Sequence, residues 1–455
     1  MTNTDNYPVA PTGVGRDEQV PVAATERTLV RVVAAAAVGT FVEYYDLAVY
    51  GFLASTIASV FFATADSSTA LLSTFAVFSV AFFARPVGGL FWGTLGDRIG
   101  RKRTLVIILN TMTVSTVLVG LLPSYATVGI VAPILLILLR LVQGLSAGGE
   151  VTGAAAFIAE FAPHGRRGFL TSWLQVSTTV ALMTGLLTAA VLNAALTEEQ
   201  MQSWGWRIAF LIALPLGIVG IYIRSKLEET PMFVAVREAA EDEAKLPGGA
   251  GPEKNSVALL KNYRQIALAA GIGVVHTLAF YIILSYLPTY LTSDGVGLTK
   301  GQSYVVLGMA TLTYIVLIPT TGLFTDRFGR RPSFFVSTVG LIAMAMPAFW
   351  LMTQGSLALA LVGQMLLVIP GSFAASTMLI AQAEMFPTKV RYTGQGIAVG
   401  VVAALFGGSA PFIAQFLSGL THSLYVPAYM IMFAAAISLV ACIRMRETVR
   451  EALPA

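Results

Sequence analysis

Long apolar runs alternate with short polar connections along most of the chain. Each run is roughly 20 residues or longer, the length that an α-helix needs to cross the hydrocarbon core of a bilayer. The runs are continuous, whereas porin-like barrels show alternating segments of about ten residues. The pattern predicts twelve membrane-spanning helices, near residues 32–62, 70–95, 104–122, 127–160, 168–194, 206–224, 264–291, 301–324, 332–352, 356–384, 393–420 and 424–443.

The composition supports an all-α integral membrane protein. Of the 455 residues, 56% are hydrophobic and 11% are charged, whereas a soluble domain carries about 25% charged residues. A water-soluble fold is therefore not expected. The first 30 residues are polar and contain no apolar run before Val32, so we expect an N-terminal tail rather than a cleavable signal peptide.

Lysine and arginine residues gather in alternate connections between the runs. Near the ends of spans, these residues collect on the cytoplasmic side. The opposite set of connections carries only Asp66, Glu198, Glu199, Arg207, Asp294 and Lys300. This alternation predicts a multi-pass protein of the cell membrane with both termini in the cytoplasm. Because the basic residues are divided among separate loops, we expect no nucleic-acid partner.

One long charged connection divides the spans into two groups of six. It covers residues 225–263 and separates a first bundle at 31–224 from a second at 264–444, with cytoplasmic tails at 1–30 and 445–455. Residues 233–246 within it could form an amphipathic helix on the membrane surface or a solvated linker helix.

Two sequence motifs each occur twice, at nearly the same spacing. The first reads GTLGDRIGRKR from Gly93 to Arg103 and GLFTDRFGRR from Gly322 to Arg331. The second joins Glu160, Pro163 and Arg167, and it returns as Glu384, Pro387 and Arg391. Two unrelated motifs that agree on a half-chain period indicate an internal duplication, and transporters are commonly built from such repeats.

The chemistry of these motifs suits a latch between the two bundles. Glycine lets helix ends approach closely, aspartate can cap a neighbouring helix N-terminus, and arginines can pair with the repeated glutamates. The alternative is that the arginines only fix the topology. We predict a cytoplasmic gate made of Gly93, Asp97, Arg98, Gly100, Arg101, Glu160, Arg167, Asp326, Arg327, Arg330, Glu384 and Arg391.

The doubled motif, together with Arg140, Gln143 and Gly144 in the fourth span, resembles the major facilitator superfamily. EYYDLAVYGF, RLVQGLSAGGEVTGA, WGWRIAFLIALPLGI and LEETPMF are similar to the metabolite:proton symporters, and most of all to proline/betaine porters. The resemblance implies two pseudo-symmetric six-helix bundles that transport by alternating access. It also implies proton-coupled uptake of a small polar metabolite such as proline or betaine.

Ionisable side chains within spans are costly and are therefore functional candidates. They concentrate in the first half of the chain, and the i, i+3, i+7 spacing of Glu43, Asp46 and Tyr50 puts these three on one helix face. A carboxylate beside an arginine can become a proton carrier when substrate draws the arginine away. The alternative is a set of fixed, buried ion pairs. We predict proton coupling at Asp46, Glu43 and Glu150, although Glu150 could be only the partner of Arg140.

Arginines are the candidate anchors for a substrate carboxylate, and aromatic faces could hold a quaternary ammonium group. Tyr44, Tyr45, Tyr281, Tyr286 and Trp173 offer such faces, although packing is the simpler role for each. His276 is a lone histidine in the seventh span, where it could instead bond to a neighbour. We predict a substrate site made of Arg85, Arg140, Tyr44, Tyr50, Gln143, Gln175, His276 and Tyr281.

Other functions are weighed against symport. A drug:proton antiporter would share the fold, but such antiporters usually carry a Gly-Pro motif in the fifth span, and no proline occurs between Gly168 and Trp204. A nutrient sensor would need a long signalling domain. No metal cluster, phosphate loop or nucleophile-base pair suggests an enzyme or a cofactor. We expect a monomer whose partners are substrate, protons and lipid. Organic acids such as 2-oxoglutarate, citrate or shikimate remain the alternative substrates.

Overall fold

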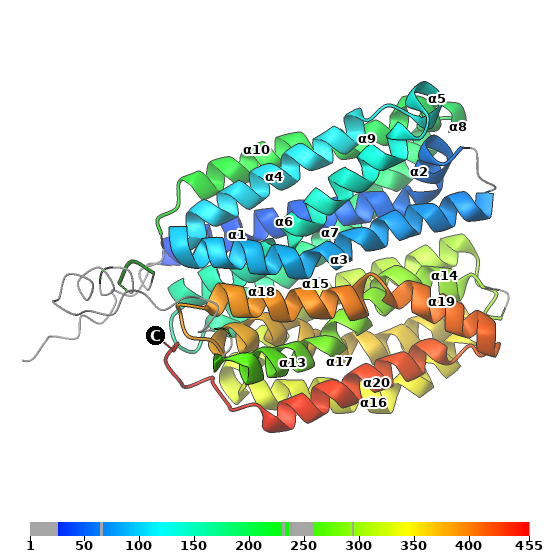
Figure 1. The fold of residues 1–455 in the computed structure, drawn as a ribbon. Coiled ribbons are helices and arrows are strands. Elements are labelled where there is room, and N and C mark those ends of the chain that lie inside the picture. The colour runs from blue at the N-terminus through cyan, green and yellow to red at the C-terminus, as the bar shows by residue number, and fades with distance from the viewer. Residues whose placement is uncertain are drawn as a thin grey trace, which may run out of the picture.

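The computed structural model describes residues 26–63, 67–229, 233–235, 238, 259, 261–293 and 295–454. Within these ranges the chain is helical, and twelve of the helices are long and apolar enough to cross a membrane. The possible surface helix at 233–246 lies largely outside the described residues. Figure 1 shows two helical bundles lying side by side, the first blue to green and the second green to red.

The first bundle contains six of the spans. The helix of the first span breaks at Leu53, so that α1 is followed by the short helix α2. The last span is assembled from α8, a π-helical turn at Met201–Gly205, α9 and α10. The bounds are α1 (Glu26–Phe52), α2 (Ala54–Phe61), α3 (Ser67–Ile99), α4 (Arg101–Leu121), α5 (Tyr125–Val128), α6 (Val131–Phe161), α7 (Arg167–Ala195), α8 (Glu198–Gln200), α9 (Trp206–Leu211) and α10 (Ala213–Ser225).

The second bundle contains the other six membrane-spanning helices. Two of its spans pass through π-helical turns, which are single-turn bulges often found at functional sites: Ile282–Tyr286 joins α13 to α14, and Ala403–Gly407 joins α18 to α19. The bounds are α13 (Tyr263–Tyr281), α14 (Leu287–Leu291), α15 (Lys300–Phe328), α16 (Arg330–Met352), α17 (Leu357–Glu384), α18 (Arg391–Val402), α19 (Ala410–Thr421) and α20 (Val426–Arg444). The predicted all-α architecture is confirmed.

The repeated motif is almost entirely helical. Helix α3 continues to Ile99 and α4 begins at Arg101, so that Gly100 alone breaks the helix. Gly100 has a φ of 103° and Gly329, in the second copy, a φ of 114°, which L-residues other than glycine rarely adopt. In each copy one glycine therefore turns the chain sharply, which places Arg101 and Arg330 at the starts of α4 and α16.

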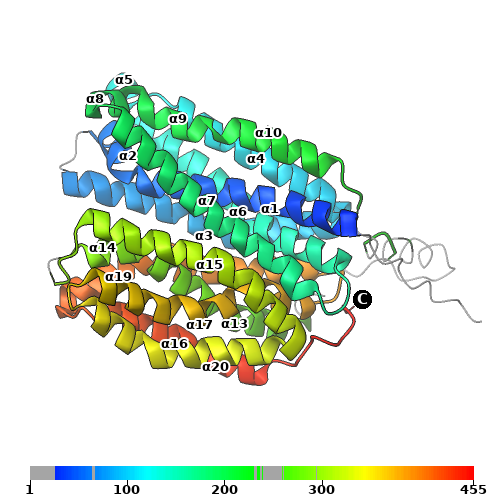
Figure 2. The ribbon, with the colours of Figure 1, turned by 180° about the vertical axis from the view of Figure 1, so that it is seen from behind.

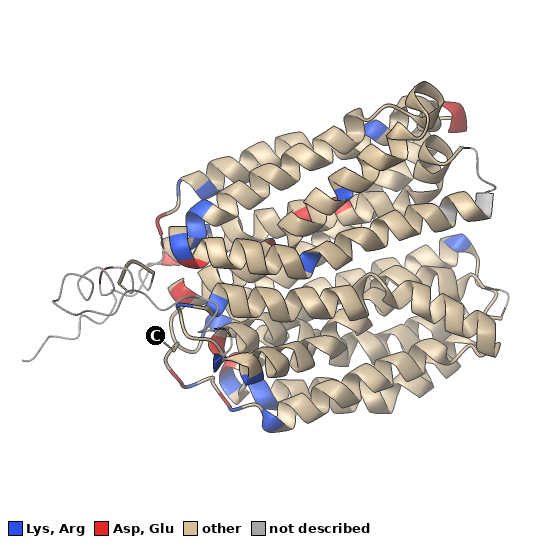
Figure 3. Ribbon diagram, in the orientation of Figure 1, with Lys and Arg blue, Asp and Glu red and all other residues tan. Residues whose placement is uncertain are grey.

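Two helix pairs form the most extensive contacts between the bundles. Helix α3 packs against α18, and α15 packs against α7; Figure 2 shows the second pair from behind. A Cβ atom on Gly89 would collide with the backbone of Gly396, so these small residues allow α3 and α18 to approach closely. Most charged residues lie at one end of the molecule (Figure 3), where both motif copies occur. We call this the motif end.

Candidate functional site

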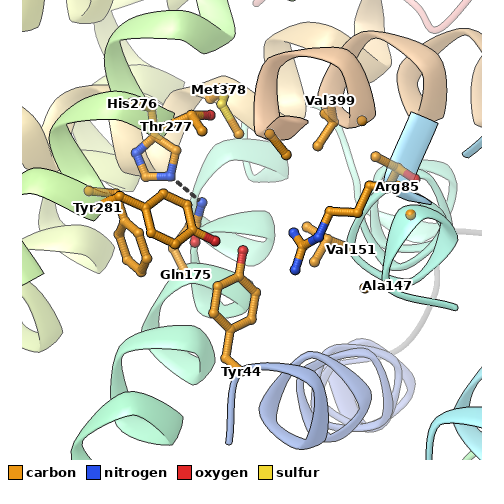
Figure 4. A pocket seen from close by; sticks show the side chains of 15 residues that line it. Tyr44, Arg85, Ala147, Val151, Gln175, His276, Thr277, Tyr281, Met378 and Val399 are labelled. Atoms are coloured by element: carbon orange, nitrogen blue, oxygen red, sulfur yellow. Dashed lines mark hydrogen bonds between the residues drawn. The ribbon is translucent and has the colours of Figure 1, made fainter. Parts of the chain in front are cut away.

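A cavity lies between the two bundles. Five residues of the predicted substrate site line it, namely Tyr44, Arg85, Gln175, His276 and Tyr281. Figure 4 shows the Arg85 guanidinium group and the rings of Tyr44 and Tyr281 pointing into the same space. Helices α1, α3, α6 and α7 supply one wall, and α13, α17, α18 and the turn after α18 supply the other. The remaining lining residues are Ala147, Gly148, Val151, Thr152, Thr277, Phe280, Met378, Val399, Gly400 and Ala403.

The Arg85 guanidinium group, which lines the cavity, forms an ion pair with the Glu43 carboxylate. Arg85 Nη2 lies 3.0 Å from Glu43 Oε1, and both side chains are buried. Among the described residues, no well-directed hydrogen bond reaches either carboxylate oxygen of Glu43. The charge of Glu43 is therefore balanced by the same arginine that faces the cavity.

Asp46 belongs to a separate, better-satisfied network inside the first bundle. It accepts hydrogen bonds from Arg140 Nη1 at 2.7 Å, from Gln143 Nε2 at 2.8 Å and from Thr116 Oγ1 at 3.2 Å. Arg140 also lies over the ring of Tyr50, 3.7 Å from its centroid. Asp46 is 1% exposed and Arg140 is fully buried. Three donors surround this one carboxylate, while Arg140 Nε and Nη2 and Gln143 Oε1 are buried without a hydrogen-bond partner among the described residues.

Three of the predicted substrate residues therefore do not line the cavity. Arg140 and Gln143 are engaged by Asp46, and the Tyr50 hydroxyl donates to the Thr74 carbonyl at 3.1 Å. Each of Glu43, Asp46 and Tyr50 has a buried partner within the first bundle. Their shared helix face therefore packs against other helices of that bundle.

Glu150 is not the partner of Arg140, which corrects one alternative from the sequence. Its carboxylate pairs with both Nη atoms of Arg224 at the end of α10. Arg224 also donates to the carbonyls of Ala35 and Leu105, at 2.9 Å each. Arg224 therefore ties α10 to α1, α4 and α6. The pair lies outside the cavity lining and acts as an internal brace of the first bundle.

A hydrogen bond crosses the cavity from one bundle to the other. Gln175 Nε2 on α7 lies 2.8 Å from His276 Nε2 on α13 (Figure 4). The amide nitrogen can only donate, so His276 Nε2 accepts and its own proton resides on Nδ1. A movement of the bundles that widens the cavity here must break this bond.

Aromatic rings from the two bundles also meet at the cavity. The Phe280 ring lies perpendicular to the Tyr44 ring, with centroids 6.1 Å apart, and Tyr281 meets Phe82 in the same way at 5.5 Å. Phe82 in turn lies under the Arg85 guanidinium, 4.6 Å from ring centroid to Cζ. Of the other aromatic candidates, Trp173, Tyr45 and Tyr286 do not line the cavity.

At the motif end, the first motif copy forms a network that reaches across to the second bundle. Arg101 pairs with Asp97 at 2.6 Å and with Glu160 at 3.4 Å. Arg391, from α18 of the other bundle, pairs with the same glutamate at 2.8 Å. Asp97 accepts from the backbone N–H of Thr393 at 3.1 Å. The aspartate thus caps the first turn of α18, as the motif chemistry suggested.

The second copy repeats this arrangement with the bundles exchanged. Arg330 pairs with Asp326 at 2.9 Å and with Glu384 at 3.0 Å, and Arg167 from α7 approaches Glu384 at 3.7 Å. Asp326 accepts from the N–H groups of Gly168 and Phe169, at 2.7 Å each, and thereby caps α7. We call these two networks the latch. All of their arginines are buried, which fixing the topology would not require.

Two predicted gate residues take no part in the latch. Arg98 and Arg327, the first arginines of the two copies, are exposed and form no ion pair with any other described residue. They point away from the partner bundle because they lie one residue further along the helix than the aspartates Asp97 and Asp326.

A known family of transporters matches most of the chain. The family model described as "Sugar (and other) transporter" matches residues 32–248 and 237–454. The chain belongs to this transporter family. It is a multi-pass membrane transporter of the major facilitator superfamily, and not an enzyme.

Several relatives share most of the transporter's length. It is 37% identical to the "Proline/betaine transporter" of Salmonella typhimurium over 93% of this chain and 84% of that protein. It is 34% identical to the "Glycine betaine/proline/ectoine/pipecolic acid transporter OusA" of Dickeya dadantii over 95% and 87%. Among solved structures, the proton:xylose symporter XylE bound to 6-bromo-6-deoxy-D-glucose has a similar fold, with a TM-score of 0.78 and 17% sequence identity. The match covers 94% of this chain and 98% of the XylE chain.

The transporter also holds a repeated element that the sequence analysis missed. Glu229 accepts from the N–H groups of Arg101 and Lys102 at the start of α4. Glu447 accepts in the same way from Arg330 and Arg331 at the start of α16. The signal was present in the sequence, because a Glu-Thr pair follows the sixth span and returns after the twelfth.

Proposed function

We propose that this transporter is a proton-coupled symporter that takes up a small zwitterion such as proline or betaine. The observation that carries the proposal is the ion pair between Glu43 and Arg85 at the cavity wall. It supplies, in one place, an anchor for a substrate carboxylate and a carboxylate able to take a proton.

The coupling follows from competition for Arg85. A substrate carboxylate that reaches the guanidinium replaces Glu43 as its counter-ion. Glu43 is then a buried carboxylate without a balancing charge, and burial favours its neutral form. Uptake of a proton from the open side neutralises Glu43, so that substrate and proton bind together. Release of substrate lets Arg85 return to Glu43 and expels the proton.

Asp46 and Glu150 have weaker claims to the coupling role. Three side chains already donate hydrogen bonds to Asp46, and Arg224 holds Glu150 away from the cavity. We therefore assign proton coupling to Glu43 and a supporting, structural role to the other two.

The cavity chemistry favours a zwitterion. Arg85 is the single Lys or Arg among the described residues that line it, which suits one carboxylate better than two or three. Tyr44, Phe280 and Tyr281 present aromatic rings nearby, and such rings attract ammonium groups by about 0.5–2 kcal/mol. The relatives named as proline and betaine transporters agree with this chemistry.

We further propose that the motif end faces the cytoplasm and that the transporter acts as a monomer. The loops at the motif end carry most of the Lys and Arg residues (Figure 3), as cytoplasmic loops do. The latch then closes the cytoplasmic side of the cavity, and both termini lie in the cytoplasm. Its ion pairs would break when the cavity opens inward.

Uptake into proteoliposomes tests the proposal. With the outside made acidic, labelled proline or betaine should accumulate, and a protonophore should abolish the accumulation. Thermal shifts with proline, betaine, ectoine, 2-oxoglutarate, citrate and shikimate would rank the ligands. Stabilisation by the organic acids alone would replace the zwitterion with an organic acid. Proton-driven export would indicate an antiporter, and binding without accumulation a sensor.

A further inference from the structure

The segment that follows α20 returns to the motif end and contacts both bundles. Helix α20 ends at Arg444, and the described chain continues to Pro454. Figure 1 and Figure 2 place the C-terminus at this end, beside the starts of helices from both bundles.

Two arginines of the latch also hold the backbone of this segment. Arg167 of the first bundle donates from Nη1 to the Glu451 carbonyl at 3.1 Å. Arg391 of the second bundle donates from Nη2 to the Pro454 carbonyl at 2.8 Å, while its Nη1 binds Glu160. The segment is thus bonded to the same side chains that join the bundles.

An apolar contact accompanies these hydrogen bonds. Leu453 is 8% exposed and packs in one cluster with Ala159 of α6 and with Ile380 and Ala383 of α17. Its neighbours Ala452 and Pro454 are exposed. A single leucine is therefore wedged between a helix of the first bundle and a helix of the second.

Polar contacts fix the start of the segment to the second bundle alone. Thr448 Oγ1 donates to Glu384 at 2.6 Å, and Glu447 caps α16. Among the described residues, the first bundle is reached further along, through the Glu451 carbonyl and the Leu453 side chain. The segment is anchored on one bundle and closes on the other.

We propose that residues 447–454 form a strap that holds the transporter closed at the motif end. Opening at that end must part α6 from α17, which exposes Leu453 and breaks the Arg167 bond to Glu451. The strap therefore stabilises the closed state and has to detach from the first bundle in each transport cycle. This inference rests on alternation of the two bundles, and it is independent of the substrate and of proton coupling.

Distances between spin labels test the strap. The labels are placed at Arg98 and Arg327, which are exposed, equivalent in the two motif copies and outside the latch, with Cys442→Ser as background. Distance distributions are recorded in nanodiscs without substrate. Leu453→Asp is the test variant, and Ala452→Asp is the matched control, since it adds the same charge at an exposed neighbouring position.

Burying a leucine side chain is worth enough to shift an equilibrium about tenfold or more. Leu453→Asp should therefore raise the ratio of long-distance to short-distance populations by about this factor, while Ala452→Asp leaves it unchanged. Identical distributions in the two variants would refute the strap. If Leu453→Asp does not fold, Leu453→Ala should give a smaller shift in the same direction, and no shift in that folded variant would equally refute it.

Discussion

Glu43 Oε1 lies 3.0 Å from Arg85 Nη2, and this pair connects the interior of the first bundle with the cavity. The neighbouring pair of Asp46 and Arg140 is closer, at 2.7 Å, but it is sealed by further hydrogen bonds. Proximity alone thus does not identify the coupling residue. What distinguishes Glu43 is that Arg85, the described cation that balances its charge, lines the cavity and is open to a ligand.

Glu43→Gln should uncouple transport from the proton gradient. With one proton per substrate, each imposed pH unit supplies about 1.4 kcal/mol, or tenfold accumulation, and the variant should lose it because the amide does not titrate. Exchange of labelled for unlabelled substrate should persist. The measurement is accumulation against counterflow in the same proteoliposomes. Loss of accumulation in Asp46→Asn, with Glu43→Gln still coupled, would move the proton site to Asp46.

Arg85→Gln should weaken substrate binding. Hydrogen bonds to a charged group contribute about 1.5–3 kcal/mol, so the Kd for proline should rise roughly 10- to 100-fold. Arg85→Lys should recover part of the affinity, because the charge returns without the planar fork. Binding is measured by calorimetry on detergent-solubilised protein. Arg98→Gln, an exposed arginine removed in the same way, serves as the control.

Phe280→Leu should discriminate between the two proposed substrates. A quaternary ammonium group has no N–H to donate and depends on aromatic faces, which contribute about 0.5–2 kcal/mol. Betaine affinity should therefore fall more than proline affinity. Competition by each compound against labelled proline measures the difference. Equal losses for both would show that Phe280 shapes the cavity without recognising the cation.

Glu160→Gln should destabilise the latch. Removing one partner of a buried ion pair costs about 3–5 kcal/mol, and Glu160 serves both Arg101 and Arg391. We expect a lower temperature of thermal inactivation. A double-mutant cycle with Arg391→Gln should give a coupling of about 0.5–3 kcal/mol. Additive effects would mean that the contact between the bundles contributes little.

Glu150→Gln should lower thermal stability without uncoupling transport. Its carboxylate balances Arg224, which also donates to backbone carbonyls of two other helices of the first bundle, α1 and α4. The variant leaves Arg224 buried without a counter-charge, which is the costly outcome. Thermal inactivation together with proton-driven accumulation per folded transporter measures both effects. A stable but uncoupled variant would return Glu150 to the list of proton carriers.

Much of the latch was predictable because its residues belong to short motifs that occur twice in the sequence. The pairing of Arg101 and Arg330 with glutamates, and the capping role of Asp97 and Asp326, follow from residue types at repeated positions. Arg98 and Arg327 lie outside these ion-pair networks, because a motif shows which residues recur but not which side of a helix end meets the other bundle.

The order of apolar and charged residues by itself determined the twelve spans, their division into two bundles and the concentration of ionisable groups in the first. Hydrocarbon length and the cost of buried charge act along the chain, so a sequence displays them directly. The tertiary structure alone decided which carboxylate pairs with which arginine in the first bundle. The pairs are Arg85 with Glu43, Arg140 with Asp46, and Arg224 with Glu150. Several carboxylates lie at similar depths in the first bundle, and only the rotation and packing of each helix select the partner within reach.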